Sequence, residues 1–179
     1  MRLVQYDGEY PRRTGFARRL EPHTRTHPAQ FFERVDRDTV RAMSNSLVDA
    51  FARFFPESQR AFNNGDFEEA LAGLAPDVEW HLLPGLPETG VIRGRDSVIR
   101  FFSETRDALN WEVHAREFLP AGPGRVFVHQ RGHFLGRATK IAGTLDFFQI
   151  WEVDETGTTV RVREYTDRAE TLKAAGLSE

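Results

Sequence analysis

The chain has 179 residues, a formal net charge of −3, 40% hydrophobic residues and no cysteine. This length suits one domain with a substantial core. The absence of cysteine excludes disulfides, thiolate metal sites and cysteine nucleophiles. No apolar run approaches the roughly 20 residues that span a bilayer, and the mildly acidic main part argues against a nucleic acid partner. We therefore predict a cytoplasmic protein that binds neither membranes nor nucleic acid.

Residues 1–42 differ in composition from the rest of the chain. They carry nine arginines scattered among six acidic residues and show no sustained hydrophobic period. Such a segment is typical of a poorly ordered, basic leader. More regular sequence begins at Met43, so the leader could also be an extension ahead of the true start. The folded domain is predicted to span 43–179.

Three helices are predicted in the first half of this domain. Apolar residues recur at helical spacing from Leu47 to Phe62. Pro56 is expected to break or kink this first helix, or to begin its second half. A short helix follows at 67–74, and a third lies within 94–110. Between them, "APDVEWHLLPG" (75–85) contains a strand.

After Trp111 the hydrophobic period changes from helical to alternating. Four strands are predicted within 111–122, 125–136, 140–153 and 158–167, with Gly-rich or Asp-rich turns between them. Short connections favour an antiparallel meander. Helices followed by a sheet predict the α+β class, with the helices packed on one face of a curved sheet.

Three segments carry a family resemblance: "AFNNGDFEEALAGLAPDVEWH" (61–81), "IRGRDSVIRFFSE" (92–104) and "DFFQIWEVDETGTTVRVREYTDRAETLKAAGL" (146–177). They resemble the SnoaL-like branch of the NTF2-like superfamily, over about residues 46–177. The resemblance implies a cone in which a strongly curved, mainly antiparallel sheet wraps about three N-terminal helices around a central apolar cavity. Relatives include polyketide cyclases, ketosteroid isomerases, limonene epoxide hydrolases and scytalone dehydratases, as well as proteins without catalysis. Many form homodimers through the outer face of the sheet, and we expect the same here.

Asp167 lies at the junction between the last strand and a C-terminal helix. The resemblance implies a functional Asp near this point, and if Asp167 faces the cavity, Tyr165 and Arg163 point the same way. A carboxylate among aromatic rings would then move protons, with Tyr165 as a hydrogen-bond donor. The segment "DRAE" (167–170) also has the form of a capping box, in which Asp167 only accepts a backbone N–H. Both interpretations stay open.

Arg131 and His133 share one face of the strand within 125–136, together with His129. Epoxide-hydrolase-like relatives carry an Arg-x-Asp pair on the matching strand, whereas this chain has Arg-Gly-His, which argues against epoxide hydrolysis. Arg131 and His133 either contact a substrate or lie on the outer face of the sheet. His129 and His133 would lie about 13 Å apart on a strand, so no metal site is predicted.

The resemblance implies a polar side chain in the cavity at Gln149, which shares a strand face with Phe147 and Trp151. The predicted function is acid–base proton transfer on a hydrophobic carbonyl compound by an isomerase, cyclase or dehydratase, without a cofactor. Asp167 and Tyr165 are the predicted catalytic residues. Substrate contacts are assigned to Trp80, Arg131, His133, Phe147, Gln149, Trp151 and Arg163. The alternative is a non-catalytic ligand-binding or dimeric interaction protein of the same fold.

Overall fold

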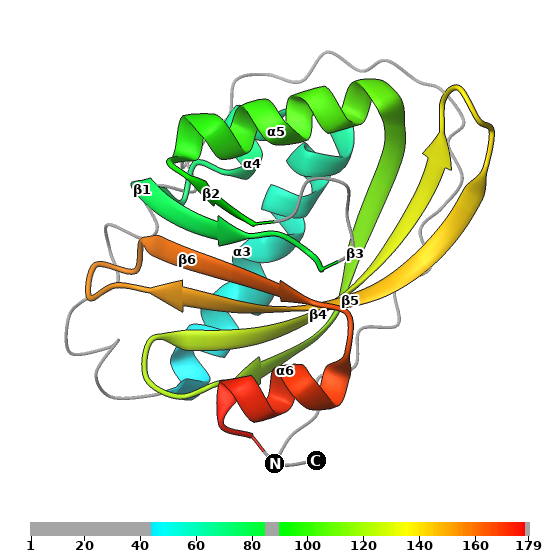
Figure 1. Cartoon of the computed structure of the whole chain (residues 1–179). Helices are drawn as coiled ribbons and strands as arrows, with labels where there is room; N and C mark the ends of the chain where they lie inside the picture. Colours follow the sequence, from blue (N-terminus) through cyan, green and yellow to red (C-terminus); the bar gives the residue numbers. More distant parts are fainter. Residues whose placement is uncertain (1–43, 85–89, 178–179) are drawn as a thin grey trace, which may run out of the picture.

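The computed structural model describes residues 44–84 and 90–177, so the predicted leader at 1–42 lies outside the described residues. Helices α3 (Ser44–Asn64) and α4 (Phe67–Ala70) come first, followed by strands β1 (Leu74–His81) and β2 (Val91–Arg93) and helix α5 (Arg95–Ala108). The rest is β3 (Leu109–Pro120), β4 (Arg125–Gly136), β5 (Ala142–Val153), β6 (Thr159–Tyr165) and α6 (Arg168–Ala175) (Figure 1). This order confirms the predicted α+β class.

The six strands form one curved sheet in the order β2-β1-β6-β5-β4-β3 (Figure 1). Strands β3 to β6 pair antiparallel with their neighbours in sequence, which confirms the predicted meander. Strand β1 pairs parallel with β6 and antiparallel with the short strand β2. Because β6 thus lies between β1 and β5, its side chains are central to the sheet.

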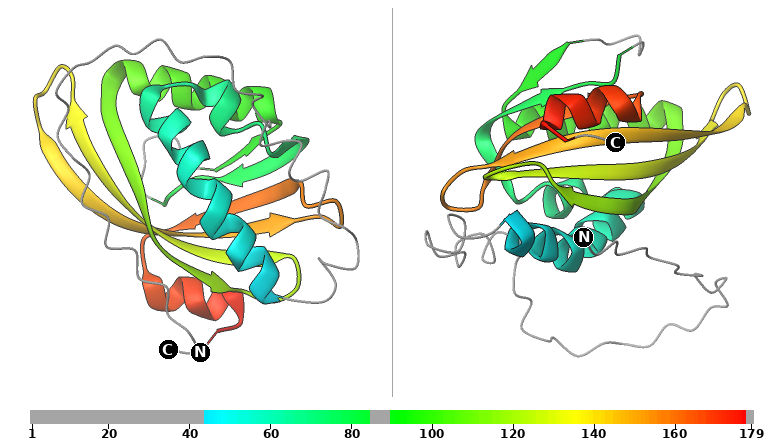
Figure 2. Two further views of the ribbon diagram at one scale, coloured as in Figure 1. Left: turned by 180° about the vertical axis from the view of Figure 1, so that it is seen from behind. Right: turned by 90° about the horizontal axis from the view of Figure 1, so that it is seen from below.

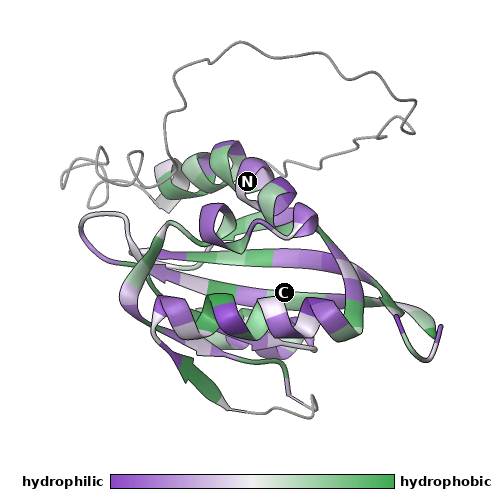
Figure 3. Ribbon diagram, turned by 90° about the horizontal axis from the view of Figure 1, so that it is seen from above, coloured by the Kyte–Doolittle hydropathy of each residue, from purple (hydrophilic) through white to green (hydrophobic). Residues whose placement is uncertain are grey.

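The helices lie on two faces of this sheet. Val126 and Val128 of β4 pack with Leu47 and Phe51 of α3 on what we call the inner face. Phe127 points the opposite way, because side chains alternate along a strand. It packs with Leu172 and Ala175 of α6 on what we call the outer face. Figure 2 shows α3 and α6 on opposite sides of the sheet. Apolar and polar residues are mixed along the strands (Figure 3).

Helix α3 is continuous through Pro56, so the expected break at this residue does not occur. Aromatic contacts hold the helix on both sides of the proline. Before the proline, the ring of Phe51 lies 5.9 Å from that of Trp151. After it, Phe62 packs against the buried cluster that contains Val113 and Phe147 of the sheet. Packing against the sheet therefore outweighs the local cost of proline inside a helix.

Candidate functional site

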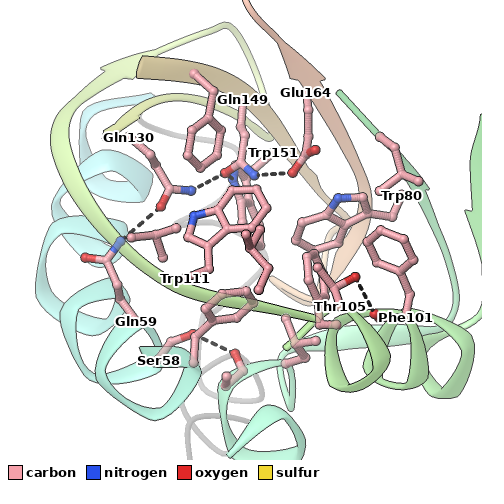
Figure 4. Close-up of a pocket in the computed structure, with 18 of the residues that line it drawn as sticks. Ser58, Gln59, Trp80, Phe101, Thr105, Trp111, Gln130, Gln149, Trp151 and Glu164 are labelled. Carbon is pink, nitrogen blue, oxygen red and sulfur yellow. Dashed lines mark hydrogen bonds between the residues drawn. The ribbon is translucent and has the colours of Figure 1, made fainter. Parts of the chain in front are cut away.

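A cavity of about 410 Å³ lies between helices α3, α4 and α5 and the inner face of the sheet (Figure 4). Its wall is mostly apolar and rich in aromatic rings, and all three tryptophans of the chain contribute to it. The aromatic lining residues are Phe55, Phe62, Trp80, Phe101, Phe102, Trp111, Phe147 and Trp151. Such a wall suits a flat, apolar ligand.

The cavity has few ionisable groups. Among the described residues that line it, only Glu104 and Glu164 carry a charged side chain, and none is basic. Glu104 is exposed on α5, whereas Glu164 lies on the central strand β6 and is half-buried. Glu164 is therefore the ionisable group at the inner wall.

Neutral donors hold the Glu164 carboxyl. The side-chain amide of Gln149 donates to its Oε1 at 2.8 Å, and the backbone N–H of Leu83 donates to its Oε2 at 3.0 Å. The indole N–H of Trp80 faces the same carboxyl without reaching hydrogen-bond geometry (Figure 4). Each carboxyl oxygen thus has one fixed donor.

Burial raises the pKa of Glu164 from its ordinary value of 4.5 to about 7. The charged form loses its hydration inside the cavity wall, and no cation there replaces it. The hydrogen bonds from Gln149 and Leu83 and the nearby indole N–H of Trp80 lower the pKa, but burial outweighs them. Near neutral pH, Glu164 therefore exchanges readily between its acid and base forms.

Three glutamines extend from this carboxyl across the wall (Figure 4). Gln59 of α3 donates to Gln130 Oε1 at 2.9 Å, and Gln130 donates to Gln149 Oε1 at 2.5 Å. Gln149 in turn donates to Glu164. Gln130 and Gln149 are 4% and 2% exposed, so the chain runs through the protein interior.

The alternation of β6 explains why Glu164 reaches the cavity. Val162, two residues earlier, is fully buried among the residues packed between the sheet and helices α4 and α5. Residues two apart on a strand share a face, so Glu164 points inward with the valine. Arg161, Arg163 and Tyr165 point to the outer face, contrary to the expectation that Arg163 and Tyr165 face the cavity.

The outer-face residues of β6 have structural contacts. Arg161 bonds to Glu79 at 3.0 Å and to Glu152 at 3.2 Å, and Arg163 forms an ion pair with the same Glu152. Tyr165 packs against the buried residues between the outer face and α6, which include Phe127, Phe148 and Leu172. Arg163 and Tyr165 are therefore absent from the cavity lining.

Asp167 caps helix α6. It is exposed, and its Oδ1 accepts the backbone N–H of Glu170 at 2.7 Å. At the other end of the helix Gly176 takes the left-handed conformation, with φ of 75°. Asp167 does not line the cavity, because the chain leaves the sheet at Tyr165, two residues earlier.

Arg131 and His133 also lie outside the cavity. Arg131 forms a two-pronged ion pair with Asp146, with N–O distances of 2.9 and 2.8 Å, and this guanidinium lowers the pKa of Asp146. His129 approaches the same carboxylate at 3.0 Å. His133 is exposed beside Thr144, with 3.1 Å between Nδ1 and Oγ1. Gly132, between Arg131 and His133 in the chain, has no side chain and leaves room for the ring of Trp111. A Cβ added at Gly132 would lie 2.7 Å from Trp111 Nε1.

Four of the residues assigned to substrate contacts line the cavity: Trp80, Phe147, Gln149 and Trp151. Sequence reasoning missed Glu164, Gln59, Gln130 and Trp111. The valines of β6 carried the signal for Glu164, because an apolar strand face points to the core and Glu164 continues that face. The alternation of β4 likewise placed Gln130 opposite Arg131.

The described part of the chain contains no cluster of three or more His, Asp or Glu side chains that could hold a metal ion. No helix in residues 44–84 and 90–177 is long and apolar enough to cross a membrane.

A family model described as a SnoaL-like domain matches residues 51–162. The chain belongs to the SnoaL-like family. This match confirms the resemblance seen in the sequence. A comparison with curated proteins finds no match.

Solved structures share the fold of this SnoaL-like domain. An NTF2-like protein of unknown function from Burkholderia pseudomallei is 27% identical with a TM-score of 0.56, and the match covers 68% of this chain and 94% of that one. A putative polyketide cyclase from Xanthomonas campestris is 21% identical with a TM-score of 0.56, covering 74% and 99%. A Mycobacterium tuberculosis protein in complex with estradiol-17beta-hemisuccinate is 22% identical with a TM-score of 0.53, covering 62% and 88%. These likenesses support the NTF2-like cone.

Proposed function

We propose that this SnoaL-like domain is a cofactor-independent enzyme that moves a proton on a hydrophobic carbonyl compound, with Glu164 as its acid–base group. The observation that carries the proposal is the Glu164 carboxyl, with a pKa of about 7, at the inner wall of an aromatic-rich cavity whose described lining residues include no cation. A pKa near the working pH suits a group that must both take up and release a proton.

The chemistry needs only this carboxylate and a bound carbonyl compound. Ionised Glu164 takes a proton from the carbon next to the carbonyl, and the C–H electron pair moves into the enolate. Return of the proton to another carbon completes an isomerisation. Attack of the enolate carbon on a second carbonyl closes a ring, and the resulting alkoxide takes the proton back from Glu164. In a dehydration the enolate expels a β-hydroxyl, which takes the same proton and leaves as water. Gln149 fixes the carboxyl while the aromatic wall keeps water away from the reacting carbon.

Trp80, Phe147 and Trp151 are the proposed substrate wall, joined by Trp111. Their rings offer flat apolar surface to a polycyclic compound. Two structural neighbours agree with this class of ligand, since one is a putative polyketide cyclase and another was solved in complex with an estradiol derivative. Glu164 takes the catalytic role that sequence reasoning gave to Asp167 and Tyr165.

Exchange of a carbon-bound proton for deuterium tests the proposal without knowledge of the natural substrate. The probe is a panel of polycyclic ketones in D₂O, beginning with anthrone, whose CH₂ group is acidic. We expect the wild type to accelerate exchange and Glu164→Gln to lose about 10²–10⁴-fold of that acceleration. Asp167→Asn is the matched control, because it makes the same chemical change outside the cavity.

Two outcomes would contradict the proposal. Equal exchange by wild type and Glu164→Gln would remove Glu164 from the reaction. Tight binding of the ketones by the wild type, with exchange at the rate of free solution, would favour the alternative of a non-catalytic binding protein. The homodimer through the sheet and the cytoplasmic location stay predictions, and light scattering on purified protein tests the former.

A further inference from the structure

The direction of the glutamine chain is set by two donors that cannot reverse. A side-chain amide can be turned so that its oxygen and nitrogen exchange places, and its partners decide the orientation. The backbone N–H of Ala115 donates to Gln59 Oε1 at 3.0 Å, and the indole N–H of Trp151 donates to Gln149 Oε1 at 2.8 Å. Neither N–H can accept a hydrogen bond, so both glutamine oxygens must face them.

This anchoring leaves one arrangement for the whole chain. With its oxygen on Ala115, Gln59 can only offer its NH₂ group to Gln130. Gln130 then offers its own NH₂ group to Gln149, whose oxygen also receives Trp151. The remaining end of Gln149 is a donor, and it meets Glu164. Reversing any one amide would set two donors against each other.

We propose that Gln59, Gln130 and Gln149 form a one-way hydrogen-bond relay, anchored by Ala115 and Trp151, that holds Glu164 as a hydrogen-bond acceptor. A protonated Glu164 could donate to Gln149 only if Gln149 turned over, and the two anchors oppose that turn. The relay thereby favours the base form of a carboxyl that burial would otherwise keep protonated. Gln59 and Trp151 are positioning residues that act on Glu164 through Gln149.

Among the described residues that line the cavity, no other charged group accounts for the preference of Glu164 for its base form. The lining residues of α3, α4, β1, β3, β4 and β5 are uncharged, and α5 contributes only the exposed Glu104. On the outer face, Arg161 is paired with Glu79 and Arg163 with Glu152. His81 lies 3.6 Å from Glu79 on that side.

A double-mutant cycle tests the relay. Gln59→Met removes one anchor and Trp151→Phe removes the other, and either anchor alone is enough to fix the direction. Carbon-13 NMR titration of the glutamate carboxyls gives the pKa of Glu164, which is assigned by its loss in Glu164→Gln. We expect small shifts in the single variants. In the double variant Gln149 is free to turn over and accept a hydrogen bond from protonated Glu164. The pKa of Glu164 should therefore rise by roughly one unit more than the sum of the shifts in the single variants.

Strictly additive shifts, or none in the double variant, would overturn the relay. Near-ultraviolet circular dichroism confirms that each variant is folded. Should the double variant not fold, Gln130→Met with Trp151→Phe cuts the same connection at another point and must show the same excess shift. The catalytic meaning of the relay rests on the proposed function, but the titration needs no substrate. A failed relay and a failed catalytic role are therefore distinguishable.

Discussion

Two glutamates on neighbouring strands show how the two faces of one sheet create different environments. Glu152 of β5 points to the outer face, where Arg161 and Arg163 pair with its carboxylate. Glu164 of β6 points to the inner face, where its partners are a glutamine amide and a backbone N–H. The outer carboxylate has the partners of a structural ion pair. The inner one has no cation, and such uncompensated burial is typical of groups that handle protons.

Shortening each glutamate by one CH₂ group should give the largest difference between the two faces. Glu164→Asp keeps a carboxyl but withdraws it from Gln149 and from a bound substrate. A misplacement of this size costs about 10²-fold in rate, so deuterium exchange into the polycyclic ketone should fall by that factor. Glu152→Asp should leave the exchange rate within about two-fold, since surface ion pairs contribute only about 0–1 kcal/mol. A large rate loss in both variants would show that the two faces are not functionally distinct.

The second-largest expected difference between the two faces is in the pH dependence of stability, to which Glu164 should contribute. Because the folded-state pKa of Glu164 is raised to about 7, the folded protein keeps a proton that the unfolded chain releases near pH 4.5. The free energy of unfolding should therefore fall as pH rises from 4.5 to 7, by up to about 3 kcal/mol from this group. Urea unfolding at several pH values measures it. Glu164→Gln should lack this component, and parallel pH profiles for wild type and variant would disprove the raised pKa.

The smallest effect is expected at Asp167, outside both faces. Asn caps a helix about as well as Asp, whereas Ala costs about 1 kcal/mol. Asp167→Asn should therefore leave the free energy of unfolding nearly unchanged, and Asp167→Ala should lower it by that amount, as urea unfolding would show. Neither variant should change deuterium exchange. Loss of exchange in Asp167→Asn would restore the catalytic interpretation of this residue.

The fold was largely predictable from the sequence because its signals are local and repeated. Alternation along 125–136 and 140–153 matches β4 and β5 closely, and helical spacing marks α3 and α5. The short strand β2 was missed because three residues carry too little pattern. A break at Pro56, one of the outcomes expected there, does not occur, because local propensity does not include the aromatic rings that hold α3 on the sheet.

The site was predicted less well because it depends on which way each strand faces. The prediction that Asp167 faces the cavity also placed the arginine-bearing face of β6 there. The fully buried Val162 shows that the other face of the strand is internal. The partners of Glu164 come from β5 and from Leu83, which follows β1, and Gln59 joins them from α3. No spacing along the chain reveals that these segments converge. Gln149 was found because the family resemblance implies a polar cavity residue at its position, and Trp80 and Trp151 were assigned to the wall because flat rings line apolar pockets.

The most direct test of a proton-handling Glu164 is the carbon-13 NMR titration of the glutamate side chains in the wild type, with Glu164→Gln for assignment. The account predicts one carboxyl signal that titrates near pH 7 and is missing from the variant. If every glutamate titrates below about pH 5.5, in the ordinary range for exposed carboxyls, Glu164 is not poised to exchange a proton at neutral pH and the proposed mechanism fails.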